Sequence, residues 1–324
     1  MILSVSRRTD IPSYYSEWFF NRIKEGFLYV RNPMNLQQVS RIELSPEVVD
    51  CIVFWTKNPE PMLEKLDGLK EYSYYFQFTL TGYGRDIESN LPHKRECMIP
   101  IFQRLSDKIG AEKIVWRYDP ILLTDKYTIE YHCKAFEQIA NALSGYTKRC
   151  VISFVDSYSK IQKSMRAVNA RLLAEDDMRL LAKAFSQIAR DNGMEIATCA
   201  EQIDLSEYGI GHSSCIDKGL IEEIIGYPIV VKKDKNQRTE CGCVESIDVG
   251  TYNTCRNGCR YCYANYSMES VMTNAKKYDV NSPLLCGTVH DEDKITIRKI
   301  QSFRKEGYFN GEILKELKET GDGN

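Results

Sequence analysis

The chain has 324 residues, a formal net charge of −2, 43% hydrophobic residues and 27% charged residues. This composition is typical of a globular protein with one large domain or two modest ones, and it excludes a disordered chain or a globally basic nucleic-acid-binding protein. No apolar run approaches the roughly 20 residues of a membrane-spanning helix, and the N-terminus has no signal-peptide pattern. We therefore expect a cytoplasmic protein with no membrane partner.

Short apolar strands alternate with helices through most of the chain. The predicted strands cover residues 2–6, 51–55, 74–80, 113–118, 150–155 and 195–199. The predicted helices between them cover residues 12–25, 60–70, 92–109, 127–143 and 159–192, the last with a break near 170–175. Residues 27–43 have the turn signal and alternation of a β-hairpin. Connections too long for hairpins predict a parallel sheet covered by helices.

This alternation predicts an α/β fold, a TIM-like (β/α) parallel barrel that is either full or partial. A doubly wound open sheet is the alternative, but no glycine-rich GxGxxG sequence follows the first strand. After residue 205 the alternation of strands and helices becomes less regular and the cysteine content rises. We divide the chain into a barrel core over 1–205, a cysteine-rich segment over 206–289 that completes the barrel, and a helical tail over 290–324.

Polar side chains follow almost every predicted strand. Reactive groups of parallel barrels gather at the C-terminal ends of the strands, so these residues are candidates for catalysis. They include Arg7, Arg8, Asp10, Lys57, Arg117, Asp119 and Glu201. Any one of them is also typical of an ordinary solvated strand end. Together they indicate a site for a small polar or anionic substrate, for example a nucleotide-like one, because guanidinium groups match phosphate and carboxylate.

The twelve cysteines are distributed unevenly, and seven of them lie within residues 199–262. Clustered cysteines in a reducing compartment more often bind metal than form disulfides. Cys255, Cys259 and Cys262 have the spacing CxxxCxxC on one short loop. Thiolates at this spacing can hold a 4Fe–4S cluster and leave one iron free for a small molecule. Zinc is the alternative, and it would need a fourth ligand from elsewhere.

Four further cysteines, Cys199, Cys215, Cys241 and Cys243, make a second set. Four thiols are enough for a second 4Fe–4S cluster or a zinc ion, and the Cys-x-Cys pair is close enough to share one metal. We therefore predict that their sulfurs converge on one point. The alternatives are that one of them is a reactive thiol, or that Cys199 belongs to the core.

The loop Cys255-Arg-Asn-Gly-Cys259-Arg-Tyr-Cys262-Tyr-Ala resembles the cluster loop of radical S-adenosylmethionine (SAM) enzymes, and its Tyr-Cys-Tyr-Ala end narrows the resemblance to the spore photoproduct lyase branch. Thr56-Lys57 and Arg117-x-Asp119-Pro120 resemble strand-end elements of the same enzymes. There they follow the cysteine loop, whereas here they precede it, which indicates a circularly permuted barrel. The chain also resembles an uncharacterised bacterial domain-of-unknown-function family with a C-terminal CxxxCxYCYA motif.

The resemblance implies an enzyme that binds a 4Fe–4S cluster and SAM, generates a 5′-deoxyadenosyl radical and accepts electrons from a donor such as flavodoxin or ferredoxin. Tyr261 would pack on the adenine of SAM. No Gly-Gly-Glu-Pro segment is visible to hold the SAM amino group, and the substrate-side thiol of the lyase cannot be located, so the resemblance implies the cofactor but not the reaction of the lyase. The alternative function is a zinc-binding nucleic-acid-binding or structural protein, favoured by Arg256 and Arg260 beside the cysteines.

A circularly permuted barrel predicts where the cysteine loop lies relative to the N-terminal strand. The cluster strand, near residues 245–254, should run parallel to residues 2–6, with the three cysteines of the loop above the C-terminal ends of the strands. If Cys255 lay at the opposite ends, a structural zinc knuckle would be the better interpretation.

Overall fold

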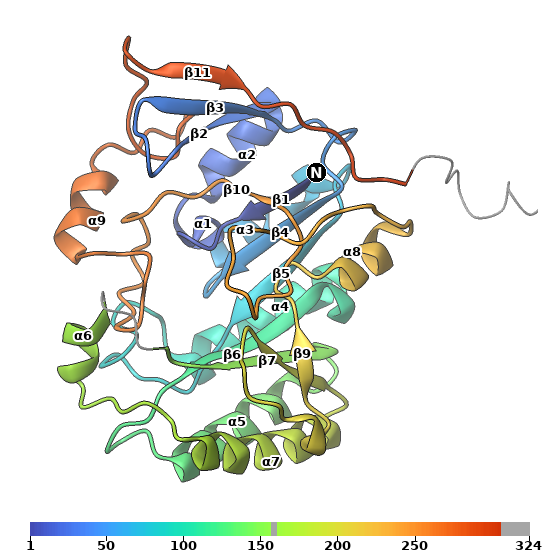
Figure 1. The fold of residues 1–324 in the computed structure, drawn as a ribbon, viewed down its shortest axis with the longest axis vertical. Helices are drawn as coiled ribbons and strands as arrows, with labels where there is room; N and C mark the ends of the chain where they lie inside the picture. The colour runs from blue at the N-terminus through green and yellow to red at the C-terminus, as the bar shows by residue number, and fades with distance from the viewer. Residues whose placement is uncertain (157–160, 306–324) are drawn as a thin grey trace, which may run out of the picture.

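A computed structural model describes residues 1–156 and 161–305, and an eight-stranded parallel sheet forms its centre (Figure 1). The strands are β1 (Ile2–Val5), β4 (Cys51–Thr56), β5 (Tyr74–Thr79), β6 (Ile114–Ile121), β7 (Arg149–Phe154), β8 (Glu195–Cys199), β9 (Gly211–Ser213) and β10 (Ile247–Asp248). Their order is β10-β1-β4-β5-β6-β7-β8-β9, and every neighbouring pair is parallel. Within the described residues β9 and β10 are the two edge strands of the sheet and do not pair with each other. The fold is therefore a partial, barrel-like α/β sheet.

Helices alternate with these strands, as the sequence predicted. They are α1 (Ile11–Tyr14), α2 (Ser16–Glu25), α3 (Glu60–Leu63), α4 (Ile99–Ile109), α5 (Ile129–Leu143), α6 (Gln162–Arg166), α7 (Glu175–Asp191), α8 (Lys218–Ile225) and α9 (Met268–Ala275). The predicted helix over 159–192 is two helices, α6 and α7, and the predicted residues 159 and 160 lie outside the described part. Among the residues described, no helix has the length and apolar character needed to cross a membrane.

A second, three-stranded sheet lies at the top of Figure 1. Strands β2 (Phe27–Arg31) and β3 (Gln38–Glu43) are antiparallel, which confirms the predicted hairpin. Strand β11 (Lys294–Ile297) pairs parallel with β3, so the prediction of a helical tail over 290–324 is wrong for this part of the tail. The alternating, β-branched Lys-Ile-Thr-Ile sequence suits a strand once β3 offers a free edge. The remaining tail residues, 306–324, lie outside the described part.

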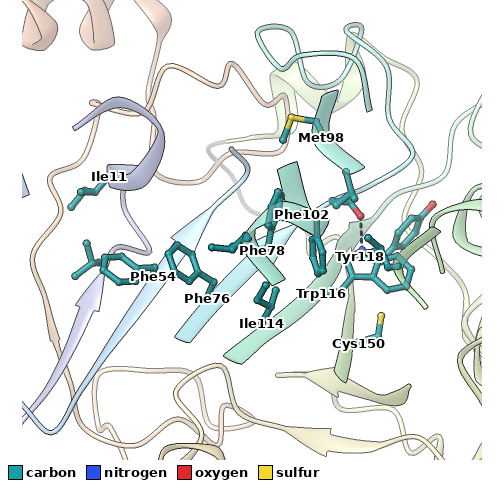
Figure 2. Close-up of a cluster of buried hydrophobic side chains, with 14 of the residues drawn as sticks. Ile11, Phe54, Phe76, Phe78, Met98, Phe102, Ile114, Trp116, Tyr118 and Cys150 are labelled. Carbon is teal, nitrogen blue, oxygen red and sulfur yellow. Dashed lines mark hydrogen bonds between the residues drawn. The ribbon is translucent and has the colours of Figure 1, made fainter. Parts of the chain in front are cut away.

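Aromatic side chains fill the helix-covered face of the large sheet (Figure 2). Phe54 of β4 stacks on Phe76 of β5 with ring centroids 4.8 Å apart. Phe78 of β5 contacts Phe102 of α4 at 4.9 Å. All four are fully buried, and truncating one such phenylalanine to alanine typically costs about 3–5 kcal/mol. This packing fixes the helices against the sheet and makes it a rigid support for its opposite face.

The opposite face of the sheet is apolar near the starts of the strands and more polar near their ends. Near their starts the strands present apolar side chains such as Val53 and Tyr75, which belong to a separate buried cluster. Two residues further on, the same face of β4 and β5 carries Trp55 and Gln77. Side chains of a strand alternate between its faces, so this face becomes polar toward the C-terminal edge of the sheet.

His132 of α5 is buried, and its environment predicts how the stability of the protein depends on pH. Its Nε2 lies 2.9 Å from the Leu122 carbonyl oxygen, and its Nδ1 lies 2.9 Å from the Tyr118 hydroxyl. A carbonyl can only accept, so Nε2 donates, and because burial disfavours a second proton on the ring, Nδ1 accepts from the Tyr118 hydroxyl. The ring is therefore neutral, and burial lowers the pKa of His132 to about 4.

Because the unfolded chain binds a proton near pH 6.5 and the folded chain only near pH 4, stability must fall as the pH drops through this window. We expect a loss of about 3 kcal/mol in the free energy of unfolding, at 1.36 kcal/mol per pKa unit. Urea titrations from pH 7 to pH 4 measure it. His132→Gln should show a shallower pH dependence over the same range, and equal slopes for both proteins would contradict the assignment.

Candidate functional site

A cavity of about 450 Å³ lies at the C-terminal edge of the large sheet. All but one of the site residues selected from the sequence line it, namely Arg7, Arg8, Asp10, Lys57, Arg117, Asp119, Cys199, Cys215, Cys241, Cys243, Cys255, Cys259, Tyr261 and Cys262. These residues come from the ends of five strands and from the segments around β10. The fold therefore gathers residues from both ends of the chain around one space.

Glu201 does not line the cavity. Its Oε1 accepts a hydrogen bond of 2.8 Å from the backbone N–H of Phe154, at the end of β7. Burial, with the nearby charges of Asp156 and Asp119, raises the pKa of Glu201 to about 7. Glu201 thus connects the ends of β7 and β8 behind the cavity wall.

Strand β10 lies beside β1, with Leu3 opposite Ile247 and Ser4 opposite Asp248 in parallel register (Figure 1). This confirms the prediction that residues near 245–254 run parallel to residues 2–6. The Asp248 carboxylate accepts hydrogen bonds from Ser4 Oγ (3.0 Å), Ser6 Oγ (2.7 Å) and the Arg7 backbone N–H (2.8 Å). The short strand is therefore held by side-chain bonds as well as by its backbone.

Gly250 follows β10 where the chain passes closest to β1. A Cβ atom at this position would lie 1.9 Å from Ser6 Oγ. Only glycine leaves room for this approach. It allows the chain to continue from β10 into the cysteine loop, residues 255–262, at the C-terminal edge of the sheet.

The cysteine loop is fastened by the segment that follows β5. Asn90 Nδ2 donates to the Arg256 carbonyl oxygen at 2.7 Å, and Ser89 Oγ donates to the Gly258 carbonyl oxygen at 3.1 Å. Gly258 has a positive φ of 69°, a conformation that glycine adopts without strain. The loop therefore has a defined conformation against the mouth of the sheet.

The thiol of Cys255 is buried, and those of Cys259 and Cys262 are partly buried. Burial raises the pKa of all three, to about 12 for Cys259. Three thiols facing one cavity suit a thiophilic iron–sulfur or zinc centre better than a hard, oxygen-preferring cation. In residues 1–156 and 161–305 no three cysteine, histidine or carboxylate side chains are already arranged as ligands of one ion. Binding would therefore require thiol side chains to turn inward.

Glu88 is a functional candidate that the sequence did not reveal. It is buried, accepts a 2.8 Å hydrogen bond from Lys57 Nζ, and also accepts from Lys94 and from the Tyr261 hydroxyl. Although burial alone would raise its pKa, the charges of Lys57 and Lys94 lower the pKa of Glu88 to about 2. Lys57 also lies 5.4 Å from the centre of the Tyr261 ring. Glu88 therefore fixes both Lys57 and Tyr261 at the cavity.

Asp10 links three parts of the site. Its carboxylate is buried and accepts from the Lys57 backbone N–H at 2.7 Å and from Asn257 Nδ2 at 3.0 Å. It also caps α1 by accepting from the Ser13 backbone N–H. Burial raises the pKa of Asp10 despite these hydrogen bonds. Its contacts join the ends of β1 and β4 to the cysteine loop.

Trp55 lies close to two arginines of the cavity wall. The guanidinium carbons of Arg7 and Arg117 are 5.7 Å and 5.5 Å from its ring centre. Arg117 is buried and donates to Asp119 through Nε at 2.8 Å. The buried Nε of Arg7 has no hydrogen-bond partner within the described residues, while Nη2 of the same side chain donates to Ser246 Oγ at 3.3 Å.

The second set of cysteines is also brought together. Cys199 Sγ and Cys215 Sγ are 2.8 Å apart, and all four cysteines belong to one buried cluster of side chains. A hydrogen bond from Cys243 lowers the pKa of Cys241 to about 7.

We predict that Glu88→Gln lowers the free energy of unfolding by about 3–5 kcal/mol, because two partly buried lysines lose the counter-charge of a fully buried carboxylate. Chemical denaturation at pH 7 measures the change. In the wild type the stabilisation should persist above pH 4.5 and be lost as the pH falls toward 2. Asp86→Asn is the control, since Asp86 pairs with Lys126 in an exposed position, where such a pair contributes about 0–1 kcal/mol. Equal effects of the two substitutions would contradict a buried charge network.

Comparisons with known proteins show a distant structural similarity and a family match. A solved structure from Bacteroides thetaiotaomicron VPI-5482, described as a proposed alpha-L-fucosidase, is similar at 13% identity with a TM-score of 0.25, and the match covers 48% of this chain and 66% of that chain. A similarity this low carries no functional argument. No curated protein matches the sequence. The family profile described as "Domain of unknown function (DUF1848)" matches residues 2–264, so this chain belongs to that family.

Proposed function

We propose that this protein is a radical SAM enzyme that holds a 4Fe–4S cluster on Cys255, Cys259 and Cys262. One observation carries the proposal: the CxxxCxxC loop follows a strand paired with β1, and its cysteines line the same cavity as the polar strand ends. When bound, the cluster would supply the electron that cleaves SAM to a 5′-deoxyadenosyl radical, which takes a hydrogen atom from the substrate.

A circular permutation of the spore photoproduct lyase-like barrel is part of the proposal. From β10 onward the sheet continues through β1, β4, β5 and β6 in spatial order. The cysteine loop thus comes first in space although it comes late in sequence. Lys57 after β4 and Arg117 on β6 then follow it in the order that the resemblance implies. The position of β10 supports this relationship.

Tyr261 is suited to contact the adenine of SAM. Its ring lines the cavity, and its hydroxyl is held by Glu88 while Lys57 lies near its face. These contacts limit the orientations of the ring. A flat aromatic surface next to Cys262 would favour stacking of a purine.

The substrate proposed is a small polar or anionic molecule, with nucleotide-like compounds as the favoured class. Arg7 and Trp55 both line the cavity, and the guanidinium group of Arg7 suits a phosphate or carboxylate. Arg8 also lines the cavity. The electron would come from a flavodoxin- or ferredoxin-like donor.

Anaerobic reconstitution with iron and sulfide tests the proposal. We expect a reduced protein with a 4Fe–4S electron paramagnetic resonance signal that shifts when SAM is added, and formation of 5′-deoxyadenosine with dithionite as reductant. Cys255→Ala, Cys259→Ala and Cys262→Ala should each remove that SAM-sensitive signal and about four iron atoms per chain.

Cys133→Ala is the matched control, because Cys133 is a partly exposed cysteine on α5, outside the cavity lining. It should retain both the signal and 5′-deoxyadenosine formation. A colourless protein that holds only zinc on the cysteine loop and releases no 5′-deoxyadenosine would reject the enzyme and support the zinc-binding alternative.

A further inference from the structure

Four cysteines of the cavity are not used by the proposed cluster. Cys199 ends β8, Cys215 follows β9, and Cys241 and Cys243 precede β10. All four side chains are more than nine-tenths buried, with exposed fractions of 2–8%. The four cysteines therefore come from segments at both edges of the open sheet.

The chain segments after β9 and before β10 contact each other at these cysteines. The Val244 backbone N–H donates to the Ile216 carbonyl oxygen at 3.1 Å. The Ile216 backbone N–H donates to Cys243 Sγ at 3.3 Å. The gap between β9 and β10, which we call the seam, is thus bridged by backbone next to two of the thiols.

The four side chains lie in one buried cluster. Cys199 Sγ lies 2.8 Å from Cys215 Sγ, and Cys241 and Cys243 belong to the same buried cluster of side chains. The buried guanidinium of Arg117 donates to Cys215 Sγ at 3.0 Å. Such N–H donors directed at sulfur are typical of metal-bound thiolates, whose negative charge they stabilise.

Cys51 provides a contrast within the same protein. It is fully buried in β4, and its thiol donates to the Ile52 carbonyl oxygen at 3.8 Å. This is the behaviour of a cysteine that fills a core position. Cys215 and Cys243 differ from Cys51, because their sulfurs accept hydrogen bonds from an arginine and from a backbone N–H.

We propose that Cys199, Cys215, Cys241 and Cys243 bind a thiophilic metal centre, either one zinc ion or one iron–sulfur cluster, that closes the seam. Four thiolates complete the coordination of either centre, and binding releases their protons to solvent. This site is separate from the proposed SAM-binding cluster and does not depend on it.

The sulfur spacing agrees with a site that closes when metal binds. Sulfurs bonded to zinc at about 2.3 Å in a tetrahedron are about 3.8 Å apart. Cys199 and Cys215, at 2.8 Å, are therefore roughly 1 Å too close to be two ligands of one ion. Rotation of one cysteine side chain supplies this change, which is consistent with the lack of a preformed metal geometry among the described residues.

The test uses a full-length variant with Cys255→Ala, Cys259→Ala and Cys262→Ala, which lacks the first site. We expect it to retain about one zinc, or about four iron with matching sulfide, per chain. Elemental and acid-labile sulfide analysis distinguishes the two centres. Adding Cys243→Ala should reduce the metal to background, whereas adding Cys51→Ala, an equally buried control, should leave it unchanged.

Titration of the intact triple variant with a mercurial reagent gives a second measurement, which does not require the quadruple variant to fold. Metal should be released in proportion to the modification of about four thiols beyond the partly exposed Cys97, Cys133 and Cys286. A folded triple variant without metal, metal retained after Cys243→Ala, or a Cys199–Cys215 disulfide in its place would overturn the proposal. The triple variant lacks the first site. Its metal content therefore tests the second site independently of SAM cleavage by the wild type.

Discussion

The parallel pairing of β10 with β1 is the interaction on which the rest of the site depends. Two residues of strand are too few to hold this position by backbone bonds alone, and the Asp248 carboxylate adds bonds to Ser4, Ser6 and Arg7. The absence of a side chain at Gly250 permits the close approach. Because the pairing is parallel, the cysteine loop must leave β10 at the edge where the other strands end.

The same strands supply both the stability and the chemistry. Phe54 and Phe76 stack beneath the helices, while Trp55 and Gln77, one residue further along each strand, face the other way. On the polar side, the buried Glu88 carboxylate neutralises Lys57 and fixes Tyr261. Any change in that charge network would therefore move the aromatic ring beside the cysteines.

Much of the fold follows from local sequence pattern, because apolar strands and amphipathic helices have distinct periods. Strand β11 was missed, since its conformation is set by its partner β3 rather than by its own residues. Strand β10 is too short to recognise by pattern, and its place followed from the resemblance. The strand-end residues were predictable because parallel strands share an edge. Glu88 was not, because its importance arises from lysines that approach it only in the folded chain.

Ser4 and Asp248 are 244 residues apart in the chain. At a typical synthesis rate of about 5–20 residues per second, roughly 10–50 s pass between the emergence of β1 and that of its partner. One edge of β1 stays open throughout this interval, which makes it a target for chaperones or for mispairing. The same delay means that the CxxxCxxC thiols reach the ribosome exit only after the other strands of the sheet. The cysteine loop is thus one of the last parts of the cavity wall to be completed during the biogenesis of the protein.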